Sequence, residues 1–122
     1  MKIEIIQLNG IKITEVISED ILIKNTQDAL DLMVNSINLG SRKIIIKEKN
    51  IIPAFFDLKT GVAGEILQKF SNYDVQLAIV GDFSKYTSKS LRDFIYESNK
   101  QGRISFINSI EEAKERLFKN NH

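Results

Sequence analysis

Near the start of the chain, β-branched residues alternate roughly with polar ones, and Asn9-Gly10 divides this stretch into two halves. Asparagine and glycine both tolerate the positive φ that a tight primed turn requires. The pattern therefore predicts an antiparallel β-hairpin that begins near Ile3 and ends near Val16.

Beyond the hairpin, segments with helical spacing of apolar residues alternate with short apolar runs that are typical of buried strands. The run Ile44-Ile45-Ile46 is β-branched and continuous, which indicates an interior strand that is buried on both faces. Helices are expected around residues 29–37, 62–70, 91–95 and 113–117, and strands at 44–46, 75–80 and 104–107.

Capping signals support these boundaries. Asn25 or Thr26 is placed to cap the first helix, and Gly40 supplies a left-handed stop after it. Ser109 and Glu112 have the spacing of a capping box, so the last helix is expected to begin there.

The order of elements predicts an α/β fold with an N-terminal β-hairpin, followed by alternating helix and strand units around a mostly parallel central sheet. The chain has 122 residues, which suits one domain spanning 1–122. Chain ends are usually frayed, so we expect a frayed tail over residues 117–122.

Composition restricts the possible partners. A formal net charge of +1 gives no electrostatic footprint for nucleic acid or for anionic membranes. Cysteine is absent, no apolar run approaches membrane-spanning length, and the single histidine is His122. We therefore expect a cytoplasmic protein that holds no metal and no cofactor.

Two polar loops are expected at the carboxyl ends of strands, where open α/β sheets bind ligands. The first spans residues 56–61 and the second spans residues 81–89, and both combine hydroxyls, a lysine and a helix start, which suits an anion. The candidate binding residues are Asp57, Lys59, Thr60, Gly61, Asp82, Ser84, Lys85, Thr87 and Ser88.

Other roles for these residues stay open. The hydroxyl and aspartate side chains are also ordinary N-cap residues. Asp57 and Asp82 could form a carboxylate pair for acid/base chemistry or a divalent metal, although the sequence offers no third ligand. Gly61 and Gly64 lack the lysine of a phosphate loop, so we expect them to let a helix approach the sheet closely.

The segments FFDLKTGVAGEILQKF and LAIVGDFSKYTSKSLRDFIYESN resemble the bacterial family catalogued as domain of unknown function 4180, and the resemblance covers nearly the whole chain. More distantly, the element order, the loop before the second helix and the Glu111-Glu112-Ala113 segment are similar to STAS domains of anti-sigma-factor antagonists. In that family a partner kinase phosphorylates the first serine of an Asp-Ser-Ser-Gly loop.

When the glycines are matched, Lys59 falls at that phosphorylated serine and Thr60 falls at the second serine. The resemblance thus implies Thr60 as a phospho-acceptor, or Lys59 as a group that attracts an anion from a partner. It further implies a non-enzymatic STAS-like binding or regulatory domain whose partner is another protein, with a small anion or a nucleotide as a further ligand. Two alternatives stay open, namely a small enzyme or sensor for a phosphorylated or carboxylated metabolite, and a homodimeric assembly module.

Overall fold

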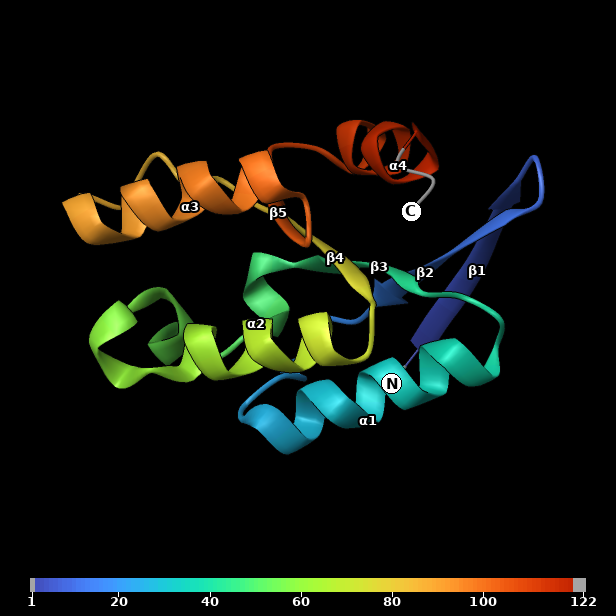
Figure 1. Ribbon diagram of the computed structural model, residues 1–122, viewed down its shortest axis with the longest axis horizontal. Coiled ribbons are helices and arrows are strands. Elements are labelled where there is room, and N and C mark those ends of the chain that lie inside the picture. The colour runs from blue at the N-terminus through green and yellow to red at the C-terminus, as the bar shows by residue number, and fades with distance from the viewer. Residues whose placement is uncertain (1, 120–122) are drawn as a thin grey trace.

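The computed structural model describes residues 2–119, and it places the helices against a five-stranded sheet (Figure 1). The main elements, in chain order, are β1 (Lys2–Leu8), β2 (Ile11–Ile17), α1 (Thr26–Asn38), β3 (Lys43–Lys47), α2 (Val62–Asn72), β4 (Gln76–Val80), α3 (Lys89–Gln101), β5 (Ile104–Ile107) and α4 (Ile110–Lys119). The expected α/β fold with an N-terminal hairpin is therefore confirmed.

The strands lie in the order β1-β2-β3-β4-β5. β1 pairs antiparallel with β2, and the other neighbours pair in parallel, so the sheet is mixed. Asn9 and Gly10 make the hairpin turn with φ of 52° and 81°, as the Asn-Gly signal predicted.

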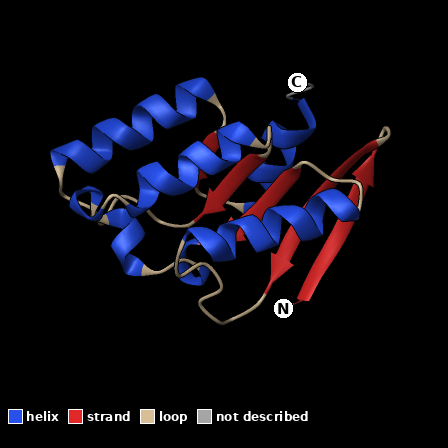
Figure 2. Cartoon of the chain, turned by 60° about the horizontal axis from the view of Figure 1, so that its bottom comes forward, coloured by secondary structure: helices blue, strands red, loops and turns tan. Residues whose placement is uncertain are grey.

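The helices are divided between the two faces of the sheet (Figure 2). One core cluster joins residues of α1, α2 and α3 to the sheet, and a second cluster joins α4 to the opposite face. The central strand β3 serves both clusters, since Ile44 and Ile46 belong to the first and Ile45 to the second. The prediction of a strand buried on both faces is confirmed.

Two buried hydroxyl groups connect α1 to the sheet by a hydrogen bond. Thr14 of β2 and Ser36 of α1 are both fully buried, and their oxygens lie 2.7 Å apart. The Ser36 hydroxyl also donates to the backbone oxygen of Ser41, at 2.8 Å. This small network sets the position of α1 over β2 because each buried hydroxyl needs a partner.

The predicted caps are present, with Asn25 accepting a hydrogen bond from the Asp28 backbone and Gly40 adopting a φ of 90°. The sequence patterns missed three short 3-10 helices between β3 and α2: η1 (Glu48–Asn50), η2 (Pro53–Phe56) and η3 (Leu58–Thr60). Each is too short to show helical periodicity.

The C-terminal helix is longer than we expected. Fraying was expected from residue 117, but α4 continues to Lys119, and Leu117 is buried in the second cluster. The expected frayed tail at 120–122, including His122, lies outside the described residues. Within residues 2–119, no helix has the length and apolar character needed to span a bilayer.

Candidate functional site

Three segments that follow parallel strands meet at the carboxyl edge of the sheet. Ile21 follows β2, the segment 48–56 follows β3, and Lys85 and Tyr86 follow β4. They enclose a pocket of about 280 Å³, which we call the carboxyl-edge pocket. Its lining residues are Ile21, Glu48, Lys49, Ile51, Pro53, Phe56, Lys85 and Tyr86.

Glu48 is the polar centre of this pocket. Its side chain is only 14% exposed, and the Lys85 ammonium lies 2.8 Å from its carboxylate. The Tyr86 hydroxyl donates a hydrogen bond to the same carboxylate oxygen. Burial of the ring, together with the hydrogen bond and negative charge of Glu48, raises the pKa of Tyr86 above its ordinary value.

Aromatic rings form one wall of the pocket. The Phe56 and Tyr86 rings stack with centroids 5.2 Å apart and an interplanar angle of 14°. Phe83 lies behind this pair, 6.2 Å from Phe56, and meets Phe106 of β5 edge-on at 5.2 Å. The Lys85 ammonium sits 5.4 Å from the Tyr86 ring centroid, a cation–π distance. The stacked rings thus form an apolar wall beside the charged centre of the pocket.

In the predicted loop before α2, the polar side chains form hydrogen bonds with nearby backbone groups. The Asp57 carboxylate accepts a hydrogen bond from the Lys59 backbone at 3.2 Å. The Thr60 hydroxyl donates to the backbone oxygens of Ala54 and Asp57, at 2.7 and 2.9 Å. Asp57 is thus the N-cap of η3, which agrees with the interpretation that the aspartates and hydroxyls of these loops cap helices.

The second predicted loop is also internally bonded. Asp82 accepts from both the backbone and the hydroxyl of Ser84, at 3.1 and 2.6 Å, and these bonds lower the pKa of the Asp82 carboxyl. Ser88 caps α3 by accepting from the Leu91 backbone at 3.3 Å. Thr87 is exposed between these two turns.

The two predicted loops therefore reach the same edge of the sheet, but their candidate residues do not form one site. Lys85 lines the carboxyl-edge pocket, while Asp82 and Ser84 line a neighbouring hollow with Asn108. Asp57 lines neither of these two hollows.

The interpretation of two glycines needs correction. Gly61 and Gly64 were expected to allow close approach of α2 to the sheet, yet a Cβ at either position would meet no atom within 4 Å. Gly61 instead adopts a φ of 78° at the start of α2, and both glycines line a hollow between α1 and α2. The close approach occurs at Gly81, where a Cβ would lie 2.7 Å from the Glu48 carboxylate.

Sequence analysis missed Glu48 and its apolar neighbours Ile21 and Pro53. The available signal was a carboxylate directly after a strand buried on both faces, because the residue that follows such a strand emerges at the binding edge. The charged run from Lys47 to Lys49 concealed it, since such runs usually belong to solvated surface.

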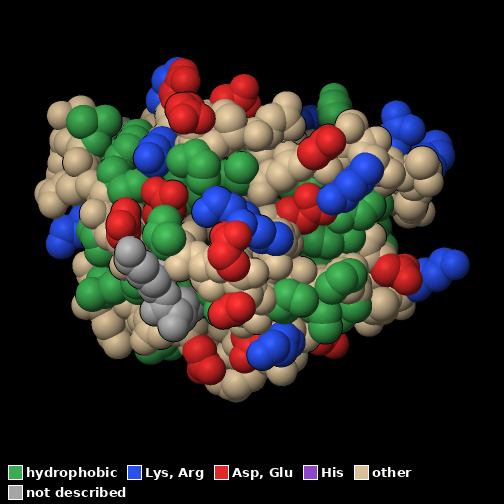
Figure 3. All heavy atoms as spheres, turned by 180° about the vertical axis from the view of Figure 1, so that it is seen from behind, with side chains coloured by type: hydrophobic (Ala, Val, Ile, Leu, Met, Phe, Trp, Pro, Cys, Tyr) green, Lys and Arg blue, Asp and Glu red, His purple; other side chains and the backbone are tan. Residues whose placement is uncertain are grey.

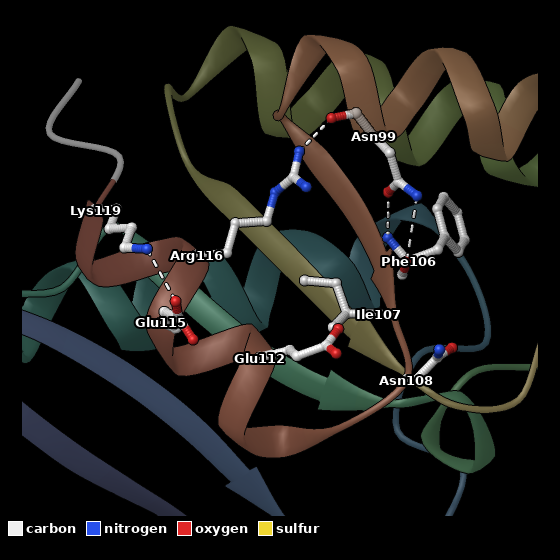
Figure 4. Close-up of a pocket in the computed structure, with 8 residues that line it drawn as sticks. All are labelled: Asn99, Phe106, Ile107, Asn108, Glu112, Glu115, Arg116 and Lys119. Atoms are coloured by element: carbon white, nitrogen blue, oxygen red, sulfur yellow. Dashed lines mark hydrogen bonds and ion pairs between the residues drawn. The ribbon is translucent and has the colours of Figure 1, made fainter.

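Another hollow, of about 590 Å³, lies between α3, β5 and α4 (Figure 4). Some of its polar groups are engaged with one another: Arg116 donates to the Asn99 backbone oxygen, and Lys119 pairs with Glu115 at 2.8 Å, whereas the buried Arg116 Nε has no hydrogen-bond partner within the described residues. Among the described residues, no group of three or more histidine, cysteine or acidic side chains is placed to hold a metal ion.

Comparison with known proteins identifies the family. The model of the family described as a domain of unknown function (DUF4180) matches residues 8–117. No curated protein and no solved structure matches the chain, and the comparisons do not show a relationship to STAS domains. The chain belongs to the DUF4180 family.

Proposed function

We propose that this protein is a non-enzymatic binding and regulatory domain that holds a partner protein at its carboxyl-edge pocket. The observation that carries the proposal is the composition of the pocket. Ile21, 42% exposed, and Pro53 form an exposed apolar rim around the Glu48 and Lys85 ion pair. Exposed apolar side chains that lie next to aromatic rings and polar groups are typical of protein-contact sites.

The pocket favours one class of occupant. Its volume of about 280 Å³ suits a single large side chain more than a whole metabolite. The half-buried Tyr86 ring, which is stacked on the buried Phe56 ring, offers an apolar surface to an apolar or aromatic side chain. We therefore propose that an exposed segment of the partner inserts one apolar side chain beside Pro53.

A small anion has less support as the main ligand. The hydroxyls of Thr60 and Ser84 are used within their own loops, and Lys85 is already paired with Glu48. The carboxylates of Asp57 and Asp82 are likewise engaged by nearby backbone groups, which argues against their use as an acid/base pair. Thr60 as a phospho-acceptor, in the manner of STAS domains, stays a prediction.

Affinity capture from the source cell tests the proposal. The wild-type domain is compared with Ile21→Arg, which places a charge on the rim, and with the matched control Val34→Arg. Val34 is 46% exposed on α1 and does not line the pocket, so its exposure is close to that of Ile21. We expect the same partner on wild type and Val34→Arg, and its loss on Ile21→Arg.

The competing ligand class is tested in parallel by thermal unfolding with inorganic phosphate and with nucleotides, for wild type and Lys59→Ala. A ligand that binds the native state raises its melting temperature. No change with these anions is expected. A stabilisation that Lys59→Ala abolishes would contradict the proposal and favour the metabolite-binding alternative.

A further inference from the structure

The two edges of the sheet differ in their backbone hydrogen bonding. At the β5 edge, the Asn99 side chain of α3 lies beside Phe106 and bonds both of its backbone groups (Figure 4). Phe106 N–H donates to the Asn99 side-chain oxygen at 2.7 Å, and the Asn99 amide donates back to the Phe106 oxygen at 3.3 Å. Asn99 thus occupies the position that an added strand would take.

The β1 edge lacks such a cover. A two-residue turn closes on the hydrogen-bonded pair Leu8 and Ile11, and hydrogen-bonded pairs alternate with non-bonded pairs along an antiparallel ladder. The non-bonded pairs of β1 are therefore Ile3, Ile5 and Gln7, whose backbone groups point away from β2. Within the described part of the chain, no other group bonds to them.

Of the devices that protect an edge strand, β1 has two charged residues, Lys2 and Glu4, but it has neither a bulge nor a proline. Its seven residues pair continuously with β2, which excludes a bulge, and its sequence contains no proline. Two of its apolar side chains are exposed, Ile5 at 38% and Leu8 at 51%. A long, regular edge with exposed apolar side chains is a template for another strand.

We infer that two copies of this chain pair through β1 to form an antiparallel, two-fold symmetric dimer with one continuous sheet. A second copy fits better than a foreign strand because a two-fold symmetric dimer leaves no open β1 edge. Self-pairing uses both open β1 edges at once and leaves only β5 edges, which Asn99 covers. A foreign strand would leave a new open edge.

The register between the two β1 strands is the one that gives them the greatest overlap. With the two-fold axis at Ile5, the whole of β1 pairs, and Ile3 lies opposite Gln7 of the second copy. The three outward residues then form hydrogen-bonded pairs that exchange about six backbone hydrogen bonds. Shifting the axis to Glu4 would oppose two like charges, which disfavours that register.

Size-exclusion chromatography coupled to light scattering measures the mass of the protein in solution and tests the inference. Wild type is expected at twice the mass of one chain, and Ile5→Pro at the mass of one chain. Proline removes the outward N–H of residue 5 and leaves the ladder to β2 intact, since that N–H does not bond to β2. Ile5→Val keeps the N–H and is the matched control, expected to remain a dimer.

Disulfide trapping tests the register without relying on a disruptive variant. The chain contains no cysteine, so each introduced thiol is unique. Ile5→Cys faces itself across the axis, at a Cα separation of about 5.5 Å that a disulfide can span. We expect oxidation to link Ile5→Cys to itself, and Ile3→Cys to Gln7→Cys in a mixture, but not Gln7→Cys to itself.

The β1-paired dimer would be overturned by a monomeric mass for the wild type at high micromolar concentration, or by a dimer in which Ile5→Cys does not cross-link. A monomer whose β1 edge instead binds a foreign strand would also contradict it. The carboxyl-edge pocket and β1 are separate surfaces, so loss of partner capture in Ile21→Arg leaves this test unaffected.

Discussion

Gly81, directly after β4, lies against the side chain of Glu48, directly after β3. A Cβ at position 81 would come within 2.8 Å of the Glu48 Cβ and within 2.7 Å of its carboxylate. Real Cβ atoms do not approach other atoms so closely, so the glycine allows Glu48 to cross the end of β4 and reach Lys85 and Tyr86. The polar centre of the pocket depends on this contact.

Gly81→Ala is expected to displace Glu48 and to lower the free energy of unfolding by about 1–3 kcal/mol, the usual cost of overpacking a tight site. Urea denaturation measures the loss. Gly64→Ala is the matched control, because a Cβ there meets no atom within 4 Å and position 64 is helical. This control should be stabilising, by about 0.5–1 kcal/mol. Equal effects in the two variants would argue against the contact.

The raised pKa of Tyr86 predicts a loss of stability at high pH. Below pH about 10, the ordinary tyrosine pKa, both the folded and the unfolded state keep the phenol proton. Above it, the unfolded state loses the proton first, so the free energy of unfolding falls as the pH rises. Urea denaturation from pH 8 to 11 measures the decline, which should be weaker in Tyr86→Phe. Identical slopes in the two proteins would contradict the assignment.

Glu48→Gln should lower the pKa of Tyr86 without returning it to the ordinary value, because burial is the largest cause of the shift. Absorbance titration of tyrosinate measures this change, and the protein has three tyrosines and no tryptophan. The difference between wild type and Tyr86→Phe isolates the absorbance change of the Tyr86 phenol. An ordinary titration of the Tyr86 phenol in the wild type would contradict its burial beside Glu48.

Asn99→Leu is expected to uncover the β5 edge. The buried backbone groups of Phe106 would lose their side-chain partners, at a cost of about 1–3 kcal/mol in the free energy of unfolding. Amide hydrogen exchange should show faster exchange at Phe106, and the variant should associate into species larger than the dimer. Asn99→Asp keeps the acceptor for Phe106 N–H, so its exchange there should be intermediate. Unchanged protection in Asn99→Leu would contradict the role of Asn99.

The buried hydroxyl pair gives an asymmetric prediction. Ser36→Ala leaves the Thr14 hydroxyl and the Ser41 backbone oxygen without this partner, whereas Thr14→Val leaves Ser36 still bonded to Ser41. Ser36→Ala should therefore destabilise by about 1–3 kcal/mol, and Thr14→Val by less. Chemical denaturation of both variants checks the order, and a reversed order would show that the Ser36 bond to Ser41 contributes little.

The sequence was informative wherever a pattern is local. The Asn9-Gly10 turn, the Asn25 cap and the triple-isoleucine strand were each predictable, because their conformation depends on a few neighbouring residues. The three 3-10 helices after β3 were not predictable, since such short turns carry no periodicity. Their positions depend on tertiary packing of residues such as Phe55, which is fully buried.

The candidate site was predictable in place but not in composition. The loop positions followed from the rule that parallel strands gather their carboxyl ends at one edge. Thr60 and Ser84 suggested an anion site, yet their hydroxyls bond within their own loops. Glu48 lacked any motif, and its importance depends on contacts with Gly81 and Tyr86 from across the sheet.

One face of the molecule has a mixed surface that suits the proposed protein contact better than an electrostatic one. Figure 3 shows one face of the molecule, on which acidic and basic side chains are interspersed with apolar patches. The near-neutral net charge of +1 fits this mixture. Specificity would then come from the shape of an apolar site and its few polar groups.

Amide hydrogen exchange on the complex with the captured partner tests the central claim most directly. The carboxyl-edge pocket predicts slower exchange in segments 48–56 and 83–86 on binding, and no such change when Ile21→Arg is mixed with the same partner. Protection confined to α4 or to the hollow around Arg116, with the pocket segments unchanged, would contradict the account and place the binding surface elsewhere.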